Sequence, residues 1–197
     1  AQIHRESPPL TAEERWHLKY LDAYEASLEG NFAAAEAPLR DVIDHSGNPA
    51  LAAKASSALL TNLAASHRYE EAFTLAHQLT SELPHIQDQS ARFAALGTLS
   101  QMLNLAGQHD LAVKYAHMME SSTPPGTSTC QPLLKMMAAL YSAKQLKSSD
   151  QELRRTIDTC QSAQEPIVAA AAELILTNLY LEENQPSRAL KLLNRIT

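Results

Sequence analysis

A recurring turn motif constrains this chain more than any other feature of its sequence. The clearest copy begins at Gly107, between apolar, helix-patterned runs over 91–106 and 111–119. Similar turn motifs begin at four other places in the chain. The residues five positions after the starts of all five motifs are 35, 72, 112, 150 and 189, and these positions are spaced by 37, 40, 38 and 39 residues. A period just under forty, filled by two helices, is typical of a helical-repeat solenoid. The sequence therefore predicts an all-α fold.

The repeat predicts about five antiparallel helix pairs in one continuous domain over residues 11–197, because each pair of a solenoid contacts mainly its neighbours. The predicted pairs are 12–29 with 32–44, 50–66 with 69–83, 87–106 with 109–121, 131–143 with 148–161, and 166–182 with 187–196. Residues 1–10 contain Ser7-Pro8-Pro9 and are predicted to be a disordered lead. The proline-rich connector 122–129 is predicted to flex, the alternative being a slightly long ordinary loop.

Composition and charge exclude some partners. Hydrophobic residues make up 45% of the chain, which is enough for a packed core, and the net charge is −6 with both signs interspersed. A nucleic-acid footprint needs a basic face, so no nucleic-acid partner is expected, and anionic lipid is disfavoured more weakly. No apolar run approaches the ~20 residues of a membrane span.

Motifs for catalysis and metal binding are missing from the sequence. It contains no glycine-rich phosphate loop, no His-Glu-x-x-His and no Gly-x-Ser-x-Gly. Pairs among the eight histidines, such as His109 and His117, are about two helical turns apart, so one metal could not easily bind both directly. Acidic pairs such as Glu70-Glu71 suit solvated helix faces. We therefore predict no catalytic residue, no metal and no cofactor.

The two cysteines occupy symmetric positions in the fourth predicted pair. Cys130 and Cys160 lie 15 residues on either side of Gln145, so an antiparallel hairpin brings them side by side. A disulfide is then geometrically reasonable, and it would contribute about 3–4 kcal/mol by the chain-entropy estimate. Such a bond favours an oxidising compartment such as a periplasm. The alternative is a pair of buried free thiols in a cytosolic protein.

The helix pairs resemble tetratricopeptide repeats (TPR), a family with a turn after the first helix, then an aromatic residue, an alanine and a late proline. The residues that carry the resemblance are Tyr69, Ala72 and Pro84, then Gly107, Ala112 and Pro124, then Gly30, Phe32 and Ala35, then Tyr180 and Ala189. The fourth pair departs from the pattern, since Asp150 replaces the packing alanine, and the repeats exceed the family's 34 residues. The resemblance implies a right-handed α-α superhelix.

The TPR resemblance also implies a concave groove lined by the first helix of each pair. Its inward positions fall on His17, Tyr20, Tyr24, Lys54, Ser57, Thr61, Gln101, Asn104, Lys135 and Asn178. This polar surface suits a protein, an extended peptide or a small polar ligand. Lys54 stands at a position like that of a carboxylate clamp, but Thr61 replaces the asparagine that a clamp needs. Packing of the two tyrosines and solvation of the two lysines are the alternatives.

The fourth and fifth pairs are also similar to the periplasmic repeat domains of bacterial membrane-anchored signalling proteins, many of which carry a diguanylate cyclase domain. The similarity rests on the cysteine pair, on Ala169–Leu174 and on Asn178–Leu181. It implies a non-catalytic periplasmic sensor that signals to a membrane-anchored output domain, with the membrane reached only through flanking segments. The alternative is a cytoplasmic TPR scaffold. No cyclase motif is present in this chain.

Two further expectations concern the ends of the chain. The chain does not start with Met, so we expect that a natural segment precedes Ala1, and apolar residues close to Thr197 lead us to expect more protein after it. Leu190, Leu193 and Ile196 form an apolar stripe on the last predicted helix. This stripe predicts a homodimer contact.

Overall fold

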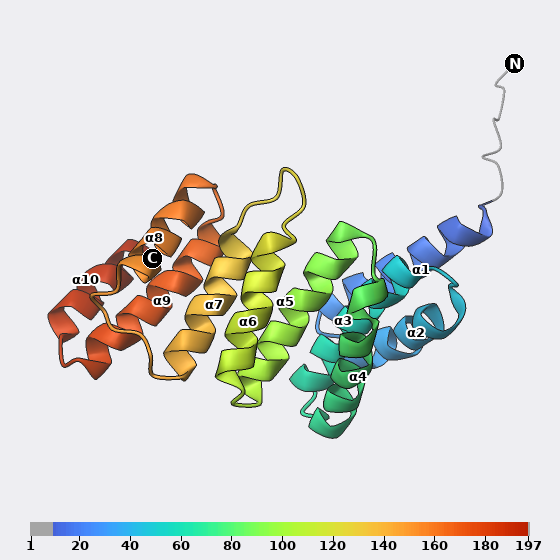
Figure 1. Ribbon diagram of the computed structural model, residues 1–197, viewed down its shortest axis with the longest axis horizontal. Coiled ribbons are helices and arrows are strands. Elements are labelled where there is room, and N and C mark those ends of the chain that lie inside the picture. Colours follow the sequence, from blue (N-terminus) through green and yellow to red (C-terminus); the bar gives the residue numbers. More distant parts are fainter. Residues whose placement is uncertain (1–9, 197) are drawn as a thin grey trace, which may run out of the picture. The chain divides into compact units, whose positions relative to one another are not determined.

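The computed structural model describes residues 10–196 and shows an all-α fold (Figure 1). Within the described residues, ten α-helices form sequential antiparallel pairs, as the sequence predicted, with one short 3-10 helix. The helices are α1 (Ala12–Leu28), α2 (Phe32–His45), α3 (Pro49–Ala65), α4 (Tyr69–Glu82), η1 (Leu83–His85), α5 (Gln89–Leu105), α6 (His109–Ser121), α7 (Cys130–Ser142), α8 (Gln151–Ser162), α9 (Pro166–Glu182) and α10 (Pro186–Ile196).

The chain divides into two compact units, which are described separately. Unit 1 ends at Gln87 and holds α1 to α4, and unit 2 begins at Asp88 and holds α5 to α10. The lead predicted over residues 1–10 lies outside the described residues except for Leu10. Flexing at 122–129, which connects α6 to α7, stays a prediction. None of the described helices is both long enough and apolar enough to cross a membrane.

Capping residues and left-handed turns set the helix bounds. Thr11 and Glu14 form the predicted capping box of α1, with the Glu14 amide donating to Thr11 Oγ1 at 3.2 Å. In four of the pairs a three-residue turn joins the two helices. Each of these turns contains one residue with positive φ, and these residues are Gly30 (79°), His67 (60°), Gly107 (75°) and Asn184 (57°). A left-handed residue at this place ends the first helix.

Unit 1 is held together by small buried residues and by an ionic network. Ala35 and Ala72, two of the predicted packing alanines, are fully buried, which lets the helices approach closely. Outside this core, Arg68 bonds both Glu36 of α2 and Glu71 of α4, and the Arg68 Nε to Glu71 Oε1 distance is 2.6 Å. Arg40 contacts the same two carboxylates. The network therefore ties the second helices of two neighbouring pairs together.

Unit 2 repeats one joint, in which the second helix of a pair packs on the first helix of the next. Thus α6 packs on α7 and α8 packs on α9, while the first helices α5, α7 and α9 contact one another in series. In the third pair, α5 and α6 pack together at Ala112, which is fully buried. The Ser100 hydroxyl donates a hydrogen bond to the Ala112 carbonyl at 2.9 Å. The small side chain at position 112 thus brings α5 and α6 into close contact.

The fourth pair differs from its prediction. We expected Asp150 inside the second helix at the packing position, but it precedes α8 as its N-cap residue, and Leu153 is buried in that helix instead. The connector between α7 and α8 spans residues 143–150, longer than the three-residue turns elsewhere. Asp150 Oδ2 accepts a hydrogen bond from the Lys147 amide at 2.5 Å. The carboxylate therefore shapes the connector, and it does not weaken the helix contact as the sequence had suggested.

Candidate protein-binding surface

The first helices of unit 2, α5, α7 and α9, contact one another in series, and their shared surface is called here the first-helix face. Lys135 of α7 crosses this face toward α5. Its Nζ donates to Gln101 Oε1 at 3.1 Å, so two predicted groove residues are in direct contact. Gly97 makes the crossing feasible, because a Cβ at this position would lie 3.2 Å from Lys135 Cε and 3.0 Å from Met119 Cε.

Lys135 is an ammonium group in a partly desolvated place. The residue is half-buried, and this burial lowers the pKa of its amine below the ordinary lysine value. Among the described residues Lys135 forms no ion pair, and its hydrogen-bond partner Gln101 is neutral. A carboxylate supplied from outside would restore the favourable charge balance.

The remaining predicted residues of this face contact neighbouring turns and helices. Asn104 Oδ1 lies 2.8 Å from His109 Nδ1, at the start of α6. Asn178 of α9 lies within hydrogen-bond reach of the Tyr141 hydroxyl, which also donates to Glu182 at 2.8 Å. This bond to Glu182 raises the pKa of Tyr141. The α7–α9 junction is thus a second polar bridge across the same face.

An apolar stripe on α9 was missed by the sequence reasoning. Ile167, Leu174 and Leu181 follow one another at seven-residue spacing and are 85%, 48% and 53% exposed. That spacing places them on one side of a helix. Asn178 lies four residues after Leu174, so the stripe shares its side of α9 with a predicted groove residue. The seven-residue spacing is visible in the sequence, but the sequence alone does not show that these side chains are exposed.

The aromatic residues predicted in unit 1 contact each other. The rings of Tyr20 and Tyr24 stack with centroids 5.7 Å apart. Tyr20 is half-buried, and burial together with the neighbouring Tyr24 raises the pKa of its hydroxyl. His17 is exposed, with Nδ1 3.0 Å from the Glu13 carbonyl oxygen. The structure thus brings two of the three residues of this predicted cluster together.

The predicted residues of α3 divide between surface and interior. Thr61 is exposed and its hydroxyl donates to the Ser57 carbonyl at 3.0 Å. Ser57 itself is buried, and its hydroxyl donates to the Ala53 carbonyl at 2.8 Å. Lys54 is half-buried. Ser57 therefore lies beneath the surface that its neighbours Lys54 and Thr61 reach.

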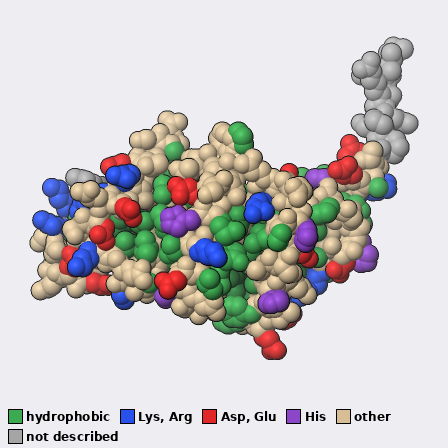
Figure 2. All heavy atoms as spheres, viewed as in Figure 1, with side chains coloured by type: hydrophobic (Ala, Val, Ile, Leu, Met, Phe, Trp, Pro, Cys, Tyr) green, Lys and Arg blue, Asp and Glu red, His purple; other side chains and the backbone are tan. Residues whose placement is uncertain are grey.

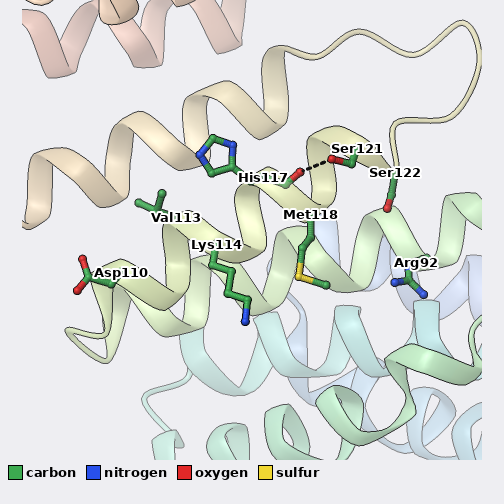
Figure 3. A pocket seen from close by; sticks show the side chains of 8 residues that line it. All are labelled: Arg92, Asp110, Val113, Lys114, His117, Met118, Ser121 and Ser122. Carbon is green, nitrogen blue, oxygen red and sulfur yellow. Dashed lines mark hydrogen bonds between the residues drawn. The ribbon is translucent and has the colours of Figure 1, made fainter.

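A shallow hollow of about 550 Å³ lies against α5 and α6 in unit 2. Figure 3 shows its lining, in which the amine of Lys114 and the ring of His117 point away from each other. Arg92 stands apart from both, and the Ser121 hydroxyl donates to the His117 carbonyl at 3.0 Å. Since these polar groups do not converge on one point, the hollow does not form a defined ligand site.

The two cysteines are buried together, as their predicted hairpin positions required. Cys130, Cys160, Val168 and Ala169 form one fully packed cluster. Both thiols are free in this structure, so the predicted disulfide is not formed here. Burial, together with a hydrogen bond with the Cys130 thiol, raises the pKa of the Cys160 thiol to about 12.

Charges and metal-ligating groups are dispersed. On the face shown in Figure 2, basic and acidic side chains alternate among hydrophobic ones. Within the described residues, no three histidine, cysteine or carboxylate side chains lie close enough to hold a metal ion.

Comparison with known proteins establishes the fold. No family model and no curated protein matches this sequence. Among solved structures, the TPR-like repeats of a putative kinesin light chain from Podosopora anserina match with a TM-score of 0.69 at 16% identity, covering 95% of both chains. A variant of those repeats matches with a TM-score of 0.70 at 15% identity and the same coverage. A mutant of MamA matches with a TM-score of 0.53 at 12% identity, covering 95% of this chain and all of that one. The chain thus has the fold of a TPR-like solenoid.

Proposed function

We propose that this protein is a non-catalytic scaffold that binds a segment of a partner protein on the first-helix face of unit 2. The observation that carries the proposal is the exposed stripe of Ile167, Leu174 and Leu181 on α9. An aligned row of large apolar side chains on a solvent-exposed surface commonly indicates an interaction site. Helices and extended peptides both present apolar side chains at regular spacing to such a face.

Lys135 adds charge selectivity to this surface. Its amine is partly desolvated and hydrogen-bonded to a neutral amide, so an acidic group of the partner would bind it as a charge-assisted pair. The partner expected from both features is a short segment with apolar residues on one side and a carboxylate nearby. A small polar metabolite fits less well, because it would leave the apolar stripe uncovered.

A peptide display library selected against the 197-residue protein tests this proposal. We expect enriched peptides to combine apolar residues at regular spacing with at least one acidic residue. Leu174→Glu/Leu181→Glu should abolish their binding, since a charge replaces each apolar contact. Lys135→Met keeps the length of the side chain but removes its charge, so acidic residues should lose their enrichment.

A matched control separates this face from general surface effects. Leu111→Glu changes an exposed leucine of α6, a second helix that does not belong to the first-helix face. This variant should bind the selected peptides as the original protein does. Equal binding by Leu174→Glu/Leu181→Glu would overturn the proposal.

The sensor hypothesis is retained only in its coarser form, as a protein-interaction domain. The comparisons give repeat proteins of the same fold and lend no support to a cyclase-linked sensor or to a periplasmic location. The disulfide is part of the proposal only for an oxidising compartment. There the contact between Cys130 and Cys160 would let the bond form within the existing cluster.

A further inference from the structure

The apolar stripe predicted on α10 is described only in part. Leu190 and Leu193 are 61% and 38% exposed, while the side chain of Ile196 lies outside the described residues. A homodimer contact through this stripe therefore stays a prediction. A different feature, in unit 1, combines a small cavity with a buried polar side chain.

This cavity is a hollow of about 160 Å³, lined by residues of α2, of α3 and of the turn after α3. Leu59 and Leu63 of α3 line it and are almost completely buried, at 1% and 2% exposed. Phe32, the first residue of α2, also lines it and is half-buried. The hollow therefore has an apolar part that belongs to the packed interior of unit 1.

Asn62 lines the same hollow and has one unused hydrogen-bonding group. The residue is only 4% exposed. Its Nδ2 donates to Ser27 Oγ of α1 at 2.8 Å, and the Ser27 hydroxyl donates its own proton to the Ala23 carbonyl at 2.9 Å. Ser27 can thus only accept from Asn62, which fixes the orientation of the amide. Oδ1 is the remaining end, and it accepts no hydrogen bond from the described residues.

The free oxygen of Asn62 is accessible to small molecules. Among the described residues, no fully buried side-chain oxygen or nitrogen lacks a hydrogen-bond partner, so Oδ1 must reach solvent. Because almost all of the residue is buried, the hollow that Asn62 lines is the place where this oxygen meets water. A group that enters the hollow displaces this water and must replace its hydrogen bond to avoid a loss of affinity.

The charged residues of the lining compensate each other. Arg68 donates to both carboxylate oxygens of Glu36, with Nη2 to Oε1 at 3.1 Å. These hydrogen bonds hold the pKa of Glu36 below its ordinary value, so both groups are ionised at neutral pH. A charged ligand would therefore lose hydration without gaining a free counter-ion. The hollow suits a neutral ligand.

Size and polarity together define the ligand. A cavity of about 150 Å³ with apolar walls accommodates benzene, so the volume here matches a single six-membered ring. A wholly apolar ring would leave Asn62 Oδ1 without a donor, which is unfavourable for a buried acceptor. A phenol satisfies both requirements, because its ring contacts the leucines and its hydroxyl donates to Oδ1.

We propose that this hollow is a binding site for a phenol group, supplied by a tyrosine side chain of a partner or by a free phenol. Asn62 Oδ1 selects the hydroxyl, and Leu59, Leu63 and Phe32 enclose the ring. The site lies in unit 1 and does not depend on peptide binding to the first-helix face of unit 2.

A methyl NMR titration of the 197-residue protein tests the proposal. With leucine methyl groups labelled, p-cresol should shift the Leu59 and Leu63 resonances in a saturable manner. Toluene has the same ring without the hydroxyl and should bind about tenfold more weakly, since it leaves Oδ1 unpaired. 4-Methylanisole retains the oxygen but has no proton to donate, so it should not recover the affinity of p-cresol.

Asn62→Leu removes the acceptor at similar side-chain volume. The preference for p-cresol over toluene should disappear in this variant, while toluene should bind at least as well as before. Ser27 keeps its bond to the Ala23 carbonyl, so circular dichroism should show a folded protein. Thr61→Leu changes the preceding, exposed residue of α3 and should retain the preference. Leu174→Glu/Leu181→Glu should lose peptide binding and still bind p-cresol, which keeps the two proposals distinguishable.

N-acetyl-tyrosinamide identifies the source of the phenol group. If it shifts the two leucines as strongly as p-cresol does, the ligand is a tyrosine side chain, whereas shifts with p-cresol alone indicate a free phenol. Equal affinity for p-cresol and toluene in the original protein would overturn the proposal without any variant. The proposal would also be wrong if p-cresol left Leu59 and Leu63 unshifted, or if folded Asn62→Leu kept the preference.

Discussion

The third and fourth helix pairs are neighbours in unit 2, yet they close by different means. In the third, Gly107 lies in a three-residue turn and the fully buried Ala112 brings α5 and α6 together. In the fourth, an eight-residue connector carries two buried side chains, Leu146 and Ser148, toward α9 and the next turn. Two helix pairs with the same repeat period can therefore be held together in different ways. One pair relies on a small buried residue, and the other relies on an anchored connector.

Removing Leu153 should break the fourth pair most severely. This leucine is fully buried in the cluster that also holds Met137, Leu176 and Tyr180. Leu153→Ala leaves a cavity and should lower the free energy of unfolding by up to about 5 kcal/mol. Chemical denaturation followed by circular dichroism measures this loss. The matched control is Leu111→Ala on the exposed surface of α6, and an equal effect of the two changes would contradict the packing argument.

Oxidising the cysteine pair should stabilise the fourth helix pair, whereas Leu153→Ala destabilises it. A Cys130–Cys160 bond would join the start of α7 to the end of α8 and raise stability by about 3–4 kcal/mol. Protein isolated from its native compartment without reductant should then show a mass lower by two hydrogens. The high pKa of Cys160 leaves little thiolate at neutral pH, so thiols must be counted by alkylation in denaturant. Two alkylated thiols would refute the bond.

The smallest effect on stability should come from removing the hydrogen bond that anchors the connector between α7 and α8. The Ser148 amide donates to Glu183 Oε1 at 2.7 Å, and the Ser148 hydroxyl donates to the other carboxylate oxygen. These bonds lower the pKa of Glu183 from the usual 4.5. The carboxylate therefore stabilises the fold at neutral pH, and this contribution is lost as the pH falls through its lowered pKa. Ser148→Ala should cost roughly 1 kcal/mol.

A pH series checks this assignment. The difference in unfolding free energy between the original protein and Ser148→Ala should be constant near neutral pH and shrink in acid. Ser149→Ala changes the next, exposed serine and should show no such pH dependence. A difference that persists unchanged in acid would show that Glu183 is not the partner that matters.

The sequence predicted the repeat well wherever a small residue follows a short turn. Ala35, Ala72, Ala112 and Ala189 are all buried at the expected places. Asp150 was misplaced because counting residues between repeats cannot distinguish a longer connector from a shifted helix. The connector is ordered by contacts with Glu183, which is far away in the sequence. Such a long-range anchor leaves no mark in the local pattern.

The candidate surface was predicted less evenly than the fold. Gln101 and Lys135 proved to be partners, because both lie on first helices that pack side by side. Ser57 turned out to be buried, since α3 is rich in small residues and no strong apolar stripe fixes its register. The exposed stripe on α9 was overlooked because exposed leucines read as core residues when only the sequence is considered.

The left-handed residues at the helix ends affect how well this protein can tolerate destabilising substitutions. Gly30 and Gly107 adopt that conformation without steric cost, while His67 and Asn184 adopt it against the preference of L side chains. The His67 ring offsets part of this cost through Nδ1, which lies 2.9 Å from the Tyr69 hydroxyl. Lys144 and Gln164, which follow α7 and α8, also have positive φ. Glycine substitutions at these four helix ends could therefore raise stability and offset destabilising changes on the surfaces that recognise partners.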